Sequence, residues 1–456
     1  MKTKDFFGNN TRTNHLFGGT TICLSRSLRI NRFMFLHVLV LLAMSFLFSQ
    51  CKEEELVLEE TETQTQTTTE TTTTDQYIIE QAVSDEAQRN TIAFDGLGFM
   101  TGNFGSQTFL PPGKVADYSG FQYLRDNDPT KLGHNTSFVT IIAFNVLNIL
   151  TTDQINMFVL RAKEQIDQIN AFGYKRLPLC KAFRRLIDGD LPSGTTGLNK
   201  DVVMAYTADL YRIDGLISYN RAQLFGQVLN SLSTAQKAKL AALKGLKGIG
   251  NWDANMTNPL EALRLQQDIN VAVMTYASEM YAWYAGSVNS DVYFCPERHG
   301  TYFGSFYLKD WPAMGNPNYT IDEKMTADAG TNLLAILTTT QADQIRGIVD
   351  LQRASLTELV LRRTDISTEL RKFLSSQTAD STSVIALSKR YGELDGQLSY
   401  FYATNFSQVY KSLSTDQKAK VLALANTLGY INPTGAFLYS QPIAMPTVTN
   451  TDFMFK

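Results

Sequence analysis

The residues best suited to bind a ligand lie in two segments that match each other at an offset of 184 positions. Residues 112–126 and 296–310 each carry a proline, a base, two tyrosines and an aspartate in one register. Both segments are too irregular for a helix, and loops on a rigid scaffold often carry function. The candidate binding residues are Lys114, Tyr118, Tyr123 and Asp126 in the first loop, and Arg298, Tyr302, Tyr307 and Asp310 in the second. The alternative is that both loops fold over helix ends, with the tyrosines in the core.

Metal and thiol chemistry have less support in the sequence. Cys295 and His299 are four residues apart, which is half of a zinc or copper site or a thiol with a base. No second half follows, and His134 is the only other histidine after the N-terminal segment. Residues 126–128 begin like a calcium loop but lack its glycine and distal glutamate. We therefore expect no cofactor, no metal, no catalytic residue and no enzymatic activity.

The elements that position these loops begin at a pattern, L-[TS]-T-x-Q, that occurs four times. Serine or threonine followed three residues later by glutamine is a capping box, in which each side chain hydrogen-bonds to the other residue's backbone N–H. Each such cap contributes about 1 kcal/mol and starts a helix without doing chemistry. The predicted caps are Thr151 with Gln154, Ser233 with Gln236, Thr338 with Gln341, and Ser414 with Gln417.

The chain is internally duplicated. Residues 214–219 match residues 395–400 at an offset of 181, and the same register continues through residues 232–239 and 413–420. The first caps of the two copies are offset by 187, which indicates a loop of different length. Gly215 and Gly396 fall inside predicted helices, where glycine is costly. They predict the close approach of another helix or of a ligand.

Apolar residues recur every three or four positions after each cap, so we expect an all-α protein. The predicted architecture is two tandem copies of an antiparallel helical-hairpin or bundle unit with irregular aromatic loops. Asn258 and Pro259 predict a helix start, and Pro178 predicts a break in the helix around it. The predicted divisions are 76–250 for the first copy, 251–430 for the second and 431–456 for an extended tail.

The N-terminal 75 residues indicate export and membrane anchoring. A basic stretch precedes an apolar run, residues 33–48, and Cys51 follows, as in a bacterial lipoprotein signal, residues 1–50. An uncleaved signal anchor is the alternative. The lysine and three glutamates after Cys51 resemble the export tag of surface lipoproteins in the Bacteroidetes. Residues 51–75 are rich in threonine and glutamate and predict a disordered tether.

The charge of the chain limits the classes of partner that it can bind. Removing residues 1–50 removes six bases and Asp5, which leaves 35 bases, 43 acids and a net charge of −8. This balance argues against nucleic acid as a partner. Cys180 and Cys295 remain outside the signal and the anchor, and both a disulfide between them and two separate thiols are open.

Helix pairs that open with L-T-x-x-Q resemble the Spy/CpxP family of periplasmic chaperones and envelope-stress proteins. That resemblance implies a cradle-shaped helical dimer, here fused in tandem as a pseudo-dimer. It also implies a non-enzymatic protein whose partners are unfolded or envelope proteins. The N-terminal residues add the expectation of an outer-membrane lipoprotein that is surface-exposed and held in the membrane by its lipid. The alternatives are a metal-binding or metal-sensing lipoprotein, and a small-ligand binder that uses the paired loops.

Overall fold

The computed structural model describes residues 85–102, 124–125, 137–243, 252–285, 324–427, 436–438, 441–443 and 447–456. All of them belong to the compact unit Thr71–Lys456. The predicted signal, the lipid anchor, the tether and all eight candidate residues of the paired loops lie outside the described residues. The predicted all-α class is confirmed.

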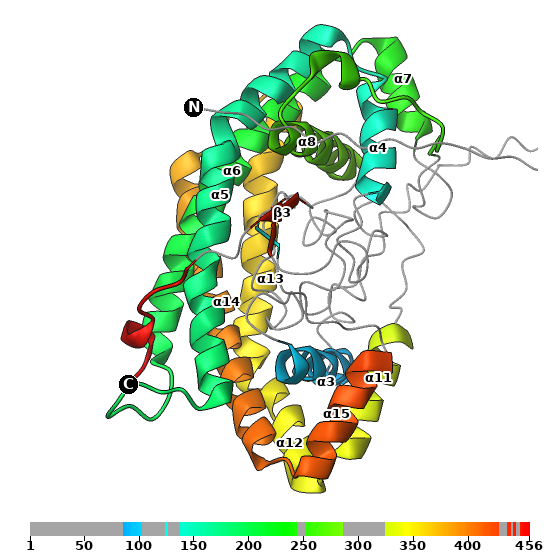
Figure 1. Ribbon diagram of the computed structural model, residues 1–456. Helices are drawn as coiled ribbons and strands as arrows, with labels where there is room; N and C mark the ends of the chain where they lie inside the picture. The colour runs from blue at the N-terminus through cyan, green and yellow to red at the C-terminus, as the bar shows by residue number, and fades with distance from the viewer. Residues whose placement is uncertain are drawn as a thin grey trace, which may run out of the picture. The chain divides into compact units, whose positions relative to one another are not determined.

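Eleven described helices make up most of this unit (Figure 1). They are α3 (Asp85–Thr101), α4 (Ser137–Leu147), α5 (Thr152–Asp188), α6 (Lys200–Ser231), α7 (Thr234–Ala242), α8 (Gln267–Ala285), α11 (Lys324–Ile336), α12 (Thr339–Arg346), α13 (Ile348–Arg371), α14 (Ser381–Ser412) and α15 (Thr415–Thr427). Short 3-10 helices are η3 (Glu261–Leu263), η6 (Lys372–Ser375) and η7 (Asp452–Met454).

The longest helices pack side by side, and the shorter helices lie at their two ends (Figure 1). α6 and α14 make the most extensive contact of any two elements, α13 packs on α14, and α5 packs on α6. Amphipathic periodicity puts the apolar residues of each helix on the face that meets its neighbour. Buried side chains from all four helices therefore belong to one continuous hydrophobic core.

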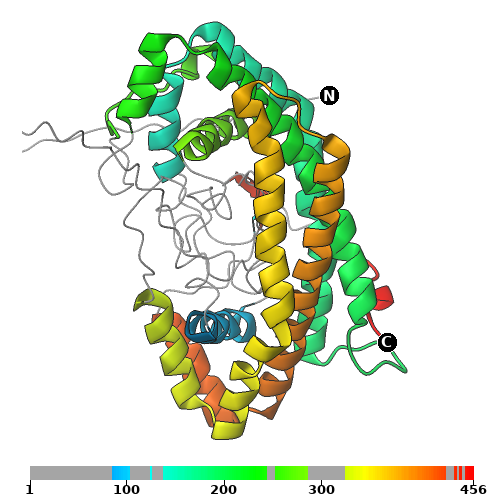
Figure 2. The same cartoon turned by 180° about the vertical axis from the view of Figure 1, so that it is seen from behind.

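The first helix of each predicted copy packs against the other copy. α3 precedes α4 in the chain but packs on α11, α12, α14 and α15. α8 precedes α11 but packs on α4 and α5. Figures 1 and 2 show the two groups at opposite ends of the long helices, with α3 beside α11 and α8 beside α4. Contacts therefore cross the predicted boundary at residue 250 in both directions.

Three short strands form a small antiparallel sheet in the order β1-β2-β3. β1 (Leu124–Arg125) pairs with β2 (Ala436–Leu438), and β2 pairs with β3 (Gln441–Ile443). β1 is the part of the first paired loop that the structure describes. The sheet therefore joins that loop to the C-terminal segment.

The break predicted at Pro178 is wrong, because α5 runs without interruption from Thr152 to Asp188. A proline inside a helix deprives the carbonyl four residues earlier of its donor. That carbonyl belongs to Tyr174, a residue that is 41% exposed. Leu177 and Leu179 beside the proline are buried, and their packing keeps the helix continuous.

The helix start predicted at Asn258 is also wrong. The Asn258 side chain accepts a hydrogen bond from the Leu260 N–H at 3.0 Å and forms a turn, and α8 begins only at Gln267. Arg264 has a left-handed φ of 47°, which no α-helix accommodates. The two copies also differ after their first cap: α5 is continuous in the first copy, whereas the second copy has α12 and α13, divided at Gly347.

Within the described ranges, no helix has both the length and the apolar character needed to cross a membrane.

Candidate functional site

All four capping boxes are present at the helix starts where the sequence places them. At the start of α5, the Thr151 hydroxyl accepts from the Gln154 N–H at 3.3 Å, and Gln154 Oε1 accepts from the Thr151 N–H at 2.9 Å. At the start of α7, Ser233 and Gln236 make the same two bonds at 3.2 and 3.0 Å. The local pattern alone accounts for these helix starts.

The two caps of the first copy are also bonded to each other. Gln236 Nε2 donates to Gln154 Oε1 at 2.7 Å and to the Ile149 carbonyl at 2.9 Å. Gln154 Nε2 donates to the Ser231 hydroxyl at 2.9 Å, at the end of α6. The glutamine of each motif therefore caps its own helix and joins that helix to the neighbouring one.

The second copy repeats this arrangement. Gln417 Nε2 donates to Gln341 Oε1 at 2.8 Å and to the Ile336 carbonyl at 3.0 Å. Gln341 Nε2 donates to the Ser412 hydroxyl at 3.0 Å. Each pair of motifs is thus one interlocked junction, and the unit has one such junction in each copy. The spacing of the motifs predicted the caps but not the bonds between them.

The α6–α14 contact depends on small residues at matched positions. A Cβ on Gly215 would lie 2.2 Å from the Ser388 hydroxyl oxygen, and a Cβ on Gly396 would lie 2.0 Å from the Thr207 hydroxyl oxygen. Both pairs correspond at the offset of 181. The close approach predicted from Gly215 and Gly396 is therefore made by another helix, and not by a ligand.

Fully buried polar groups line this helix crossing. Asp214 and Asp395, which correspond at the same offset, are both 0% exposed. Arg363 of α13 donates to the Tyr391 hydroxyl at 3.3 Å, and its guanidinium lies 5.5 Å from the centre of the Tyr391 ring. Burial raises the pKa of Tyr391, the Arg363 charge opposes that rise, and the charges of Asp395 and Asp214 add to it.

These groups cannot act on a dissolved substrate while they remain buried. The hydrogen bond from Arg363 to Tyr391 joins α13 to α14.

A second buried charged group holds α8 in place. Arg221 of α6 pairs with Glu279 of α8 at 2.7 Å, and both side chains are 0% exposed. The Arg221 guanidinium also lies 5.2 Å from the centre of the Tyr276 ring. Tyr276 in turn donates to Gln165 Oε1 of α5 at 2.8 Å. Sequence reasoning missed this pair, because its members are 58 residues apart and the position equivalent to Arg221 is Tyr402.

The C-terminal segment is anchored at the connection between α5 and α6. The Met454 carbonyl accepts from the Asn199 N–H at 2.7 Å, and the Lys456 N–H donates to the Gly197 carbonyl at 2.9 Å. Leu198 and Phe455 form an isolated antiparallel bridge. Met454 is 0% exposed, so the segment has an apolar anchor as well as backbone bonds.

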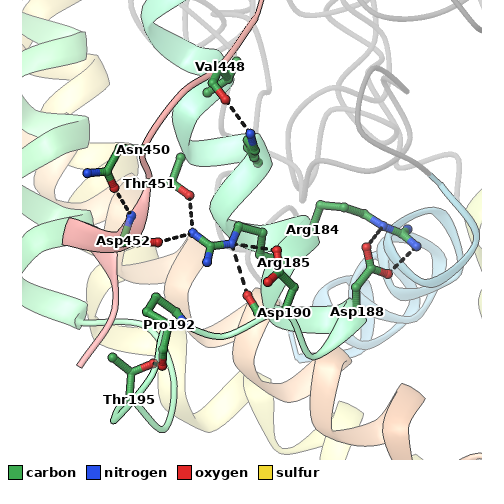
Figure 3. A network of polar contacts seen from close by, with 11 residues as sticks. Arg184, Arg185, Asp188, Asp190, Pro192, Thr195, Val448, Asn450, Thr451 and Asp452 are labelled. Atoms are coloured by element: carbon green, nitrogen blue, oxygen red, sulfur yellow. Dashed lines mark hydrogen bonds and ion pairs between the residues drawn. The ribbon is translucent and has the colours of Figure 1, made fainter.

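Arg185 ties this segment to the end of α5 (Figure 3). Its guanidinium donates to the Asp452 carboxylate at 2.6 Å, to the Thr451 hydroxyl at 3.0 Å and to the Asp190 carboxylate at 3.0 Å. The hydrogen bond with Asp452 contributes most to raising the pKa of Arg185. The guanidinium also lies 5.1 Å from the centre of the Phe455 ring.

The predicted site residues thus have different outcomes. The eight cap residues lie together in two junctions. Cys180 is 2% exposed on α5, and Cys295 lies outside the described residues, so both alternatives, a disulfide and two separate thiols, stay open. The ligand role of the paired loops also stays a prediction. Among the residues that the structure describes, no group of three or more histidine, cysteine, aspartate or glutamate side chains is placed to hold a metal ion.

No protein-family model, curated protein or solved structure matches this chain.

Proposed function

We propose that this chain is a non-enzymatic cell-envelope lipoprotein that binds other proteins, and that its two copies form a built-in pseudo-dimer of the L-T-x-x-Q type. The observation that carries the proposal is the paired junction. In each copy, two caps are bonded glutamine to glutamine, at 2.7 Å in one copy and 2.8 Å in the other. The reciprocal packing of α3 and α8 adds the exchange expected between two halves of a dimer.

Exposed apolar side chains on the long helices support a protein partner. Tyr174 of α5 and Leu361 of α13 correspond at the offset of 187 and are 41% and 50% exposed. Single exposed apolar residues are common on any protein surface. Two of them at equivalent positions identify the side chains to test. Such side chains suit the exposed apolar segments of an unfolded client.

The membrane part of the proposal rests on the sequence around Cys51. A lipid on this cysteine and the tether after it would hold the folded unit outside the cytoplasm, at the outer membrane. Metabolic labelling with a fatty acid tests this directly. Label in the natural protein and none in a Cys51→Ala variant is the expected result, and an unlabelled natural protein would overturn the anchor.

The protein-binding part is tested with residues 76–456 and a chemically denatured client whose aggregation scatters light. We expect suppression of scattering at a few-fold molar excess without ATP. The double variant Tyr174→Ser with Leu361→Ser should suppress less. Leu422→Ser is the matched control, because Leu422 is 49% exposed on α15 and lies outside this pair. Folded protein that leaves client aggregation unchanged would overturn the proposal.

A further inference from the structure

Two asparagines at equivalent positions have different surroundings. Asn145 of α4 corresponds to Asn332 of α11 at the offset of 187, the same offset that relates the first caps of the two copies. Both helices lead into a capping box of the same kind, at Thr151 and at Thr338. Asn145 is 2% exposed, whereas Asn332 is an exposed residue. The two helices therefore differ in what covers this face.

A non-helical segment between α7 and α8 covers α4 and is held by its backbone. Asn145 Nδ2 donates to the Asp253 carbonyl at 2.9 Å, and Asn145 Oδ1 accepts from the Asp253 N–H at 3.0 Å. Asn148, almost one turn further along α4, donates to the Thr257 carbonyl at 2.9 Å. An amide side chain has both a donor and an acceptor, so it can pair with both polar groups of one backbone residue. These bonds hold the main chain of the segment and do not depend on its side chains.

The equivalent segment of the second copy is used in the small sheet. The register of 181 continues beyond the last caps at three matched positions, which are Leu243 with Leu424, Gly248 with Gly429 and Asn251 with Asn432. In this register residues 255–257 correspond to β2. β2 pairs with β1 of the first paired loop. The residues that correspond to part of the cover of α4 thus lie in the sheet, which agrees with the exposure of Asn332.

The open face of α11 combines a polar amide with apolar surface. Ala335 and Ile336 follow Asn332 by three and four residues, so all three lie on one side of the helix. Ala335 is exposed, and Ile336 is partly buried against the core. Ala335 stands where α4 has Asn148, so α11 keeps the asparagine that pairs twice with a backbone residue and replaces the other. Leu333 on the opposite side is 0% exposed and keeps the helix in place.

We propose that the α11 face formed by Asn332, Ala335 and Ile336 binds a non-helical segment of a partner protein, with the Asn332 amide paired to the N–H and carbonyl of one partner residue. The first copy identifies this kind of occupant, because the equivalent asparagine holds such a segment there. Main-chain hydrogen bonds give affinity without reading the sequence. The face therefore suits the many different segments that an unfolded client presents. This inference rests on the proposed protein-binding function and names the part of the partner that is bound.

Fluorescence anisotropy with a labelled peptide of residues 250–258 and the full chain tests this face. The peptide contains the backbone that Asn145 holds in the first copy. Asn332→Ala should weaken peptide binding about tenfold, because it removes two hydrogen bonds. Thr331→Ala is the matched control, because Thr331 is exposed on the same helix but outside the proposed face, and it should leave binding unchanged. Circular dichroism establishes that both variants are folded.

A methylated peptide tests whether the backbone is the group that is recognised. A methyl group on the amide nitrogen of Asp253 removes the donor from which the asparagine accepts. The methylated peptide should bind the natural protein about tenfold more weakly than the unmethylated one. Asn332→Ala should then weaken its binding little further, because two groups that interact directly give non-additive effects when both are changed.

Three peptide results would overturn the inference: no saturable binding to the folded natural protein, equal binding by Asn332→Ala and Thr331→Ala, or additive effects of Asn332→Ala and methylation. A natural protein that sediments as a dimer, and as a monomer once Asn332 is alanine, would make a second copy the occupant and would also overturn it. The proposed function is judged separately. Peptide binding at Asn332 without protection of a denatured client counts against the function alone, and client protection without peptide binding counts against this site alone.

Discussion

Replacing Gln236 by alanine should destabilise the protein more than replacing Ser233, its partner in the capping box. Ser233→Ala removes one side of the capping box and should cost about 1 kcal/mol. Gln236→Ala removes the other side, in which Oε1 accepts from the Ser233 N–H at 3.0 Å. It also removes the two Nε2 bonds to Gln154 and Ile149 at 2.7 and 2.9 Å. Comparing the two variants thus separates the contribution of the cap from that of the hydrogen bonds that join two helices.

The magnitude follows from the number of bonds. Each hydrogen bond contributes a net of about 0.5–1.5 kcal/mol, and Gln236 is only partly buried, so three bonds together contribute about 2–3 kcal/mol. Gln417 makes the same three contacts in the second copy, at 3.0, 3.0 and 2.8 Å. Gln417→Ala should therefore cost about as much. A double variant with Gln154→Ala should show a coupling energy of about 1 kcal/mol, because the two side chains are in contact.

Guanidinium-induced unfolding of residues 76–456, followed by circular dichroism, measures these differences. The slope of the unfolding free energy against denaturant concentration must be the same in all variants for the comparison to hold. The reasoning fails if Gln236→Ala and Ser233→Ala cost the same, since the bonds between the motifs would then contribute nothing. It also fails if Gln154 and Gln236 show no coupling.

Three further predictions concern the core and its charges. Arg221→Met or Glu279→Leu alone should lower the free energy of unfolding by about 3–5 kcal/mol, because each leaves a buried charge without its partner. The double variant should have nearly the same free energy of chemical unfolding as the natural protein, and additive losses would contradict this. Gly396→Ala should cost about 3 kcal/mol by overpacking and lower the melting temperature, while Gly197→Ala, which has open space, should change it little; equal effects would refute the close contact. The pKa of Glu369 is lowered, first by a backbone hydrogen bond, so its stabilisation is present above the usual glutamate pKa of about 4.3 and is lost as pH falls through the lowered value. The free energy of unfolding of Glu369→Gln should therefore approach that of the natural protein as the pH falls from 7 to 3. A difference that stays constant with pH would contradict the assignment.

Local patterns were readable from the sequence because the interactions behind them are local. A capping box needs only residues three apart, so Thr151 and Gln154 could be assigned before the structure was known. Gly215 and Gly396 predicted a close approach because glycine in a helix has no other common reason. The all-α class followed from apolar periodicity, which sums over many residues.

Long-range packing could not be read in the same way. Pro178 has a local preference to end a helix, but the buried residues beside it outweigh that preference. Asn258 has a strong capping preference, yet Arg264 in a left-handed conformation ends any helix begun there. The pair of Arg221 and Glu279 depends on where α8 packs, and no repeat of the pair signals it. Tertiary context decides each of these cases.

The exchange of α3 and α8 explains why the repeat in the sequence does not by itself define a packing unit. The chain segment α4 to α8 is continuous and packs together, whereas α11 to α15 is completed by α3 from the far side of the first copy. One group therefore has all its helices in chain order, and the other borrows its last helix from an earlier position. α3 is far in the sequence from the helices it packs on, so its contacts keep it in place, and not a short connection. The two equivalent seats use different contacts: a buried ion pair between Arg221 and Glu279 holds α8, and an ion pair between Asp85 and Arg353 is among the contacts that hold α3.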